Sequence, residues 1–151
     1  MSETYKMAKA FKKKYKMTIA WRLKKHSEII DLHLNSDEKV KYVFLGQKNH
    51  GAFDFVNTNI IVLTNKRLLI ATKRLMFGYF FTSITPDLFN DLTIKKSIIW
   101  GRVIIDTVKE EVLLSNIDPK ALPEIESNIV EYMMKQKKKY KNRLDMKEGS
   151  Q

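Results

Sequence analysis

Between Glu38 and Ile117, apolar and polar residues alternate, and turn-forming residues interrupt the alternation at short intervals. Alternation with a period of two is typical of strands that bury one face. The connections are too short for the crossover helices that parallel neighbours require, so we expect an antiparallel sheet. The pattern predicts a mostly β chain of α+β type with seven strands, at residues 40–44, 53–63, 67–73, 75–84, 92–95, 98–106 and 112–117.

Helical spacing replaces this alternation at both ends of the chain. In residues 1–25, apolar side chains recur every three or four positions, which predicts one amphipathic helix with Ala8, Phe11, Tyr15, Ile19 and Leu23 on its apolar face. Ser27 is expected to cap a second, short helix that ends near Leu34. Asp118 and Pro119 are typical of a helix start, and the predicted closing helix continues into the basic run 135–141. The chain is therefore expected to divide into residues 1–36, 37–134 and 135–151.

Positive charge is concentrated at the two ends. The net charge is +11, yet residues 26–134 contain slightly more acidic than basic side chains. Residues 1–25 carry nine lysines and arginines against Glu3, and residues 135–151 carry seven against Asp145 and Glu148. Basic arms of this kind attract phosphate polymers, anionic lipid headgroups or acidic protein surfaces.

Several functional classes are not expected from the composition. The chain has no cysteine, which excludes disulfides and thiolate metal sites and suits a reducing cytoplasm. No run approaches the roughly 20 apolar residues of a membrane span. The three histidines form no metal-binding motif, and Gly46 and Gly51 lack the Lys-Ser/Thr that a P-loop requires. We therefore expect no enzyme activity, metal or cofactor, and a cytoplasmic chain that can lie peripherally on the inner face of the membrane.

The stretch Leu63–Lys73, with the sequence LTNKRLLIATK, resembles the signature hairpin of bacterial pleckstrin-homology domains, particularly the YokE-like group. Asp37-Glu38, Asp91–Ile94 and Asn116–Asp118 resemble other parts of that family in the same order, so the resemblance spans residues 37–134. It implies a seven-stranded, partly open antiparallel barrel capped by a C-terminal helix, without catalytic activity. It also implies a module that binds a lipid surface or a protein and that is often oligomeric.

The N-terminal helix is the first candidate for docking to a membrane or a partner. Aromatic residues surrounded by lysines suit a helix that lies in the plane of an anionic membrane. The alternative is that the apolar face packs on the barrel or on another subunit and leaves the lysines solvated. The candidate docking residues are Phe11, Lys12, Lys13, Lys14, Tyr15, Lys16 and Trp21.

Two further basic groups are candidates for anion binding. The first belongs to predicted strand ends and loops of the barrel and comprises Lys41, Lys48, Lys73 and Arg74; the second is the C-terminal extension, with Lys135, Lys137, Lys138, Lys139 and Lys141. Thr64-Asn65-Lys66-Arg67 is interpreted as a structural turn, in which Asn65 provides backbone shape and Arg67 packs or forms an ion pair. The C-terminal lysines are equally explained as a solvated helix end.

Two functions from different classes follow. The first is a non-enzymatic binding module that docks on a protein partner or an anionic membrane surface and forms a homo-oligomer. The alternative is a nucleic-acid-binding accessory protein that uses both basic arms, with Tyr15 or Trp21 stacking on bases. Against the alternative, Phe77, Tyr79 and Phe81 are expected in the core, which leaves no basic–aromatic platform on the strands.

Overall fold

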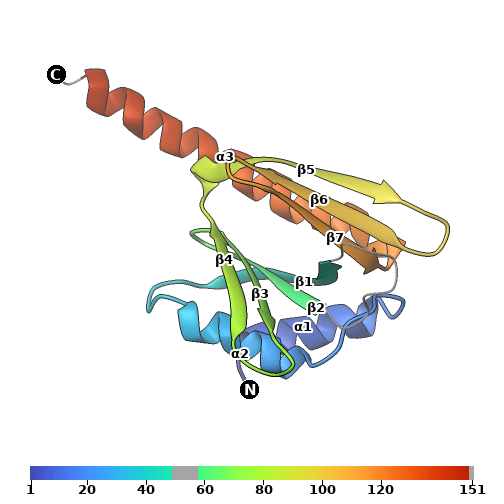
Figure 1. Ribbon diagram of the computed structural model, residues 1–151. Helices are drawn as coiled ribbons and strands as arrows, with labels where there is room; N and C mark the ends of the chain where they lie inside the picture. The colour runs from blue at the N-terminus through green and yellow to red at the C-terminus, as the bar shows by residue number, and fades with distance from the viewer. Residues whose placement is uncertain (49–57, 150–151) are drawn as a thin grey trace.

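The computed structural model describes residues 1–48 and 58–149 (Figure 1). The helices are α1 (Glu3–Lys14), α2 (Leu23–His33) and α3 (Leu122–Gly149), and two short 3-10 helices are η1 (Pro86–Leu88) and η2 (Pro119–Ala121). The strands are β1 (Val40–Lys48), β2 (Thr58–Thr64), β3 (Leu68–Lys73), β4 (Tyr79–Ile84), β5 (Phe89–Lys96), β6 (Gly101–Thr107) and β7 (Glu111–Ile117).

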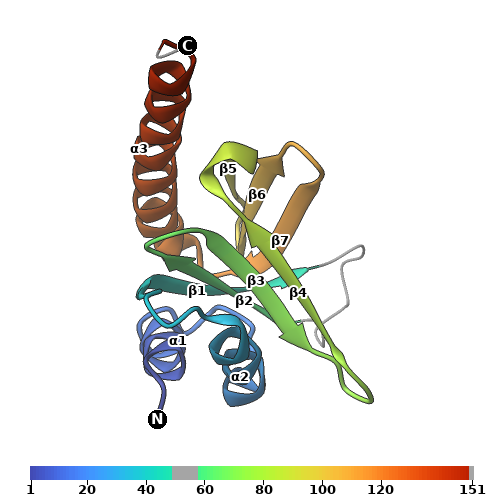
Figure 2. The same ribbon diagram turned by 90° about the vertical axis from the view of Figure 1, so that its left-hand side faces the viewer.

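All seven strands form one antiparallel sheet in the order β4-β3-β2-β1-β7-β6-β5. β1 pairs with β2 along most of its length, whereas among the described residues its pairs with β7 are Gln47–Ser115 and Lys48–Leu114. The sheet therefore consists of two half-sheets, β1–β4 and β5–β7, which cross each other at the end of β1 (Figure 2). The end strands β4 and β5 are not paired with each other, so the barrel is open, as predicted.

α3 packs against β5 and β6 and buries Leu122, Ile125, Ile129 and Met133. Its first turn lies directly on Gly101, where an added Cβ atom would be 2.6 Å from Leu122 Cδ1. Any larger residue at position 101 would push the start of α3 away from the sheet. The closing helix is confirmed, and it continues straight to Gly149, well beyond the edge of the sheet (Figure 1).

The prediction of one long N-terminal helix is wrong. α1 ends at Lys14, and a linker of residues 15–22 leads to α2. The Lys12 ammonium group stabilises this end by donating to the carbonyl oxygens of Lys16 and Thr18, and Arg22 takes a left-handed conformation with φ of 53° at the start of α2. Ser27 is not a cap, because it lies inside α2 and donates to the Leu23 carbonyl oxygen. Trp21 therefore belongs to the linker and not to a helix.

The apolar face of α1 packs on the domain itself. Ala8, Phe11 and Tyr15 are buried, and the Phe11 ring lies 5.0 Å from the Tyr15 ring and 6.5 Å from the Phe44 ring of β1. Phe11 and Tyr15 therefore cannot serve as docking residues, because the sheet already covers them. The alternative interpretation, that this face packs on the barrel, is confirmed.

α2 completes the covering layer by packing on β2 and β3. In Figure 1, α1 and α2 lie together on one side of β1–β4. All seven residues of β2 are buried, which requires that both faces of this strand are covered. Residues 1–36 thus share one core with the sheet and are not an appendage.

Several strand boundaries also differ from the predictions. Gly46–Lys48 continues β1 although a turn was expected there, since β7 pairs with this stretch. β4 begins at Tyr79 and not at Leu75, because Gly78, with φ of 74°, ends a tight turn. Phe77 and Tyr79 are exposed, so their assignment to the core is wrong, whereas Phe81 packs against the core. Residues 53–57 of the predicted strand 53–63 lie outside the described residues.

If α1 is part of the core, Phe11→Ala should unfold the domain more easily. Truncation of a buried phenylalanine removes its packing and leaves a cavity, so we expect a loss of about 3–5 kcal/mol in the free energy of unfolding, measured by urea denaturation. Lys13→Ala is the matched control on the exposed face of the same helix and should change little. Equal stability of the Phe11→Ala chain would contradict the role of α1.

Candidate functional site

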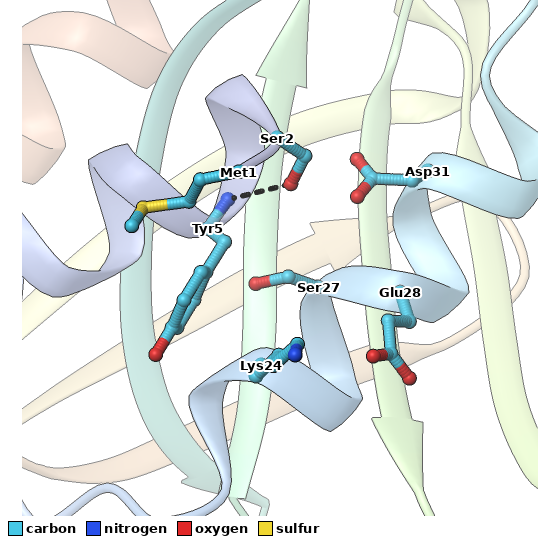
Figure 3. A pocket seen from close by; sticks show the side chains of 7 residues that line it. All are labelled: Met1, Ser2, Tyr5, Lys24, Ser27, Glu28 and Asp31. Carbon is cyan, nitrogen blue, oxygen red and sulfur yellow. Dashed lines mark hydrogen bonds between the residues drawn. The ribbon is translucent and has the colours of Figure 1, made fainter.

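A cavity of about 340 Å³ lies between the start of α1 and α2 (Figure 3). Its lining residues are Met1, Ser2, Tyr5, Lys24, Ser27, Glu28 and Asp31. The two serine hydroxyls are already used by the helices, since Ser2 accepts from the Tyr5 backbone N–H and Ser27 donates to Leu23. Within residues 1–48 and 58–149, no group of three or more histidine or acidic side chains could hold a metal ion.

The Thr64–Arg67 turn is a structural connection to the entry of β1. The Arg67 guanidinium group pairs with the buried Glu38 carboxylate at 2.9 Å, and the Thr64 hydroxyl donates to the same carboxylate. The Asn65 side chain accepts from the Lys39 backbone N–H and donates to the Asp37 carbonyl oxygen. Asn65 thus acts through hydrogen bonds, and its expected role in backbone shape is wrong, because its φ is not positive.

The electrostatics of this turn leave no charge for an external anion. Burial acts to raise the pKa of Glu38, but hydrogen bonds from Arg67, the Asn35 N–H and Thr64 outweigh it and hold the pKa below its ordinary value. Glu38 is therefore ionised and neutralises Arg67. Lys66 is paired with Asp37 at 2.7 Å. The structural interpretation of the turn, including the predicted ion pair of Arg67, is confirmed.

The 15–22 linker runs along the place where the two half-sheets meet. Here the ends of β1, β3, β5 and β7 lie beside the starts of β2, β4 and β6. The pairs are Gln47–Thr58, Gln47–Ser115, Lys73–Tyr79, Lys96–Gly101 and Gly101–Ile117. We call these strand ends the corner. Hydrogen bonds hold the linker across the corner: Trp100 Nε1 donates to the Met17 carbonyl oxygen, Ile19 N–H to the Asn116 carbonyl oxygen, Trp21 N–H to Thr58 Oγ1, and Arg22 Nη1 to the Lys73 carbonyl oxygen. At the end of β7, Asp118 accepts from the Met17 N–H and donates its own N–H to Thr18 Oγ1.

The β3–β4 turn projects from one side of the corner. Met76 and Phe77 are 81% and 80% exposed, and Leu75 and Phe80 are also exposed. The Arg74 guanidinium group lies 5.2 Å from the centre of the Phe80 ring. No acidic residue occurs between Lys66 and Pro86 in the sequence. The turn thus has an apolar tip, and the residues from which it projects are positively charged. Arg22 adds a further positive charge beside Lys73.

The family model described as Bacterial PH domain matches residues 34–131 of the chain. The chain belongs to the bacterial PH domain family. Among solved structures, this PH domain is similar to a pleckstrin homology domain from Shewanella amazonensis SB2B, with 12% sequence identity, a TM-score of 0.48, and coverage of 71% of this chain and 84% of that chain. A comparison with curated proteins finds no match. Membership of the YokE-like group remains a prediction.

The structure separates the predicted anion-binding residues of the PH domain. Lys73 and Arg74 lie at the corner, and Lys48 ends β1 there. Lys41 lies seven positions before Lys48 on the same strand, about 23 Å away along it. Lys48, Lys73 and Arg74 are therefore brought to one end of the sheet, whereas Lys41 is not.

The remaining predicted basic residues have mixed positions. Lys14 is paired with Glu124 at the start of α3 at 2.7 Å, and Lys12 stabilises the end of α1, whereas Lys13 and Lys16 are exposed. In the C-terminal extension, the Lys137 ammonium group donates to the Phe89 carbonyl oxygen. The other lysines of this group are exposed along the projecting half of α3, and they are Lys135, Lys138, Lys139 and Lys141.

The sequence interpretation missed the apolar turn residues Leu75, Met76 and Phe77. It assigned them to a strand because they are apolar and precede an aromatic run. A signal was present, since a Lys-Arg pair stands directly before them and a glycine directly after them. Among the described residues, no helix is long and apolar enough to cross a membrane.

Arg67→Ala should destabilise the domain because it leaves the Glu38 carboxylate buried without its partner. We expect a loss of about 3–5 kcal/mol in the free energy of unfolding. Lys66→Ala removes an exposed ion pair from the same turn, so its stability in the same urea titration should stay close to that of the unaltered chain. Two equally small effects would show that the Glu38–Arg67 pair does not stabilise the fold.

His26 fixes the base of the β3–β4 turn. Its Nδ1 atom accepts a hydrogen bond from the Lys73 N–H at 2.8 Å, and its ring is buried. Burial, together with the positive charge of Arg22, lowers the pKa of His26 from 6.5 to about 4. The folded domain therefore holds this imidazole neutral, with Nδ1 as an acceptor.

The sign of the pH effect follows from this depressed pKa. The contribution of neutral His26 to the free energy of unfolding is fully present above pH 6.5, its ordinary pKa. This contribution is lost as the pH falls from 6.5 to about 4. The expected loss is on the order of 3 kcal/mol, measured by urea denaturation across that window. His26→Gln keeps an acceptor for the Lys73 N–H but cannot titrate, so its stability should fall less steeply. Identical pH profiles would exclude His26 as the cause.

Proposed function

We propose that this PH domain is a non-catalytic docking module that attaches to an anionic membrane surface through its β3–β4 turn. The observation that carries the proposal is the projecting tip of Leu75, Met76 and Phe77 above Lys73 and Arg74. Apolar side chains of this size enter the boundary between headgroups and acyl chains, and the basic residues behind them face the phosphates. Membership of the PH domain family supports a binding role over a catalytic one.

The magnitudes suit reversible attachment. Transfer of a leucine, methionine or phenylalanine side chain from water contributes about 1.5–3 kcal/mol. Each basic residue near an anionic surface contributes about 1 kcal/mol, and Arg22, Lys73 and Arg74 are close to the tip. These gains have to exceed an association cost of at least about 4 kcal/mol. The sum supports binding that depends on both the apolar tip and the charge.

Other docking sites and other ligands have weaker support from the structure. The predicted docking face of α1 is covered by the sheet, so the site of attachment moves to the corner. Nucleic-acid binding remains a prediction, and the exposed lysines of the projecting α3 are the residues that would carry it. Self-association and a protein partner likewise remain predictions.

The double variant Met76→Ser/Phe77→Ser tests the proposal by co-sedimentation with vesicles. The unaltered chain should bind vesicles of equal parts phosphatidylglycerol and phosphatidylcholine, bind pure phosphatidylcholine much less, and lose affinity as salt increases. The double variant should bind the anionic vesicles roughly tenfold to hundredfold more weakly. Val108→Ser is the matched control, because Val108 is an exposed apolar residue in the β6–β7 turn beside Lys109 and Glu110.

Two outcomes would overturn the proposal. One is equal binding to neutral and anionic vesicles, since the basic residues would then have no role. The other is unchanged affinity of the Met76→Ser/Phe77→Ser chain. Duplex DNA titrated into the same samples gives the competing result: binding to DNA without binding to vesicles would favour the nucleic-acid function.

A further inference from the structure

The β5–β6 turn, from the other half-sheet, also combines exposed apolar residues with basic neighbours. Ile98 is 102% exposed, and Ile99 next to it is exposed as well. The turn is closed by a hydrogen bond from the Ser97 N–H to the Trp100 carbonyl oxygen at 3.0 Å. Lys95 and Lys96 precede it and Arg102 follows it, all three exposed. No acidic residue occurs between Leu92 and Ile105.

We infer that this turn is a second, independent membrane contact, so that the domain docks at two points and in one orientation. The inference rests on the proposed function, because it takes the same anionic surface as the ligand. It adds a binding site, formed by Ile98 and Ile99 with Lys95, Lys96 and Arg102, and it specifies which side of the molecule faces the bilayer.

The linker connects the two turns rigidly. It is hydrogen-bonded to Trp100 at the β5–β6 turn and to Lys73 at the β3–β4 turn, with Asn116 and Thr58 between them. Met17 and Trp21 are exposed along this path. No acidic residue occurs between Lys12 and Ser27. The linker is thus apolar and basic between the two turns, and the acidic residue that it contacts, Asp118, is buried and accepts hydrogen bonds from the Met17 and Lys120 N–H groups.

The far ends of the half-sheets have a different character. The Thr64–Arg67 turn carries Asp37 and Glu38, and the β6–β7 turn carries Asp106, Glu110 and Glu111. These acidic side chains offset the basic residues beside them, as Asp37 and Glu38 do by pairing with Lys66 and Arg67, so an anionic surface is attracted more strongly to the corner.

The shape of the corner favours a bilayer over a folded protein as its ligand. The exposed apolar residues sit on two separate projecting turns and do not line a groove. A fluid surface can admit both tips at once, whereas a rigid partner would need two pockets at a matching separation. Once one turn has entered the bilayer, the second is held at high local concentration near it, which strengthens attachment without any new contact.

The inference fixes where α3 points. In Figure 1 the C-terminal end of α3 projects to the upper left, whereas the β5–β6 turn lies at the right and the β3–β4 turn at the bottom. Docking through both turns would direct the basic half of α3 away from the bilayer. A domain attached by the β3–β4 turn alone would be free to rotate about that turn.

Site-specific fluorescence tests the inference in the full chain. Because the chain has no cysteine, single variants Met76→Cys, Ile98→Cys, Val108→Cys and Tyr140→Cys can each carry one environment-sensitive dye. On addition of vesicles of equal parts phosphatidylglycerol and phosphatidylcholine, we expect a blue shift at positions 76 and 98 and none at 108 and 140. Circular dichroism before labelling confirms that each variant is folded.

The outcomes separate the inference from the proposed function. A shift at 76 without a shift at 98 would overturn the second contact and leave the first in place. Absence of a shift at both would overturn both, and a shift at 140 would overturn the orientation. As a second measurement, Ile98→Ser/Ile99→Ser should weaken co-sedimentation by about tenfold, and unchanged affinity would contradict the inference.

Discussion

Within residues 1–48 and 58–149, two residue pairs, Gln47–Ser115 and Lys48–Leu114, join the strands of the two half-sheets. A junction this short would be a weak point if nothing else held it. The Gln47 side chain is fully buried and accepts a hydrogen bond from the Asn116 side chain. The backbone of Asn116 has a left-handed conformation. A buried, satisfied amide pair fixes the geometry of neighbouring strands, since any shift would leave polar groups unpaired. The angle between the half-sheets, and with it the position of every turn at the corner, depends on this contact.

The N-terminal helices bury apolar surface that the sheet alone would expose to water. β1, β2 and β3 are apolar on both faces, so a sheet covered on one face alone would expose a large apolar surface to water. α1 and α2 cover that surface, and their linker then has to cross the strand ends, where it forms hydrogen bonds with β2, β3, β7 and the β5–β6 turn. The same segment that completes the core therefore also forms the middle of the proposed docking surface. Folding and the proposed docking therefore depend on the same residues of the linker.

Much of the fold could be predicted from the sequence, because alternation and helical spacing report burial directly. Seven strands, antiparallel pairing, the closing helix and the structural role of Thr64–Arg67 all follow from local patterns. The linker could not be predicted, because Tyr15 and Ile19 continue the helical spacing although both lie outside any helix. Phe77 was wrongly assigned to the core for a related reason. An apolar residue near a basic pair gives the same sequence pattern whether it is buried in a strand or projects from a turn. Exposure of this kind depends on tertiary packing, which no local pattern contains.

At Arg22, the backbone conformation that favours stability and the side chain that favours the proposed docking require different residues. A non-glycine residue in the left-handed region costs about 1 kcal/mol, so glycine at this position would relax the backbone. Glycine would also remove the hydrogen bond to Lys73 and one positive charge from the side of the molecule that we propose faces the membrane. The chain keeps the strained residue, as proteins commonly do where a surface has a task besides folding. Engineering this domain for greater thermal stability would start at position 22, and it is there that a more stable variant would be the poorer binder.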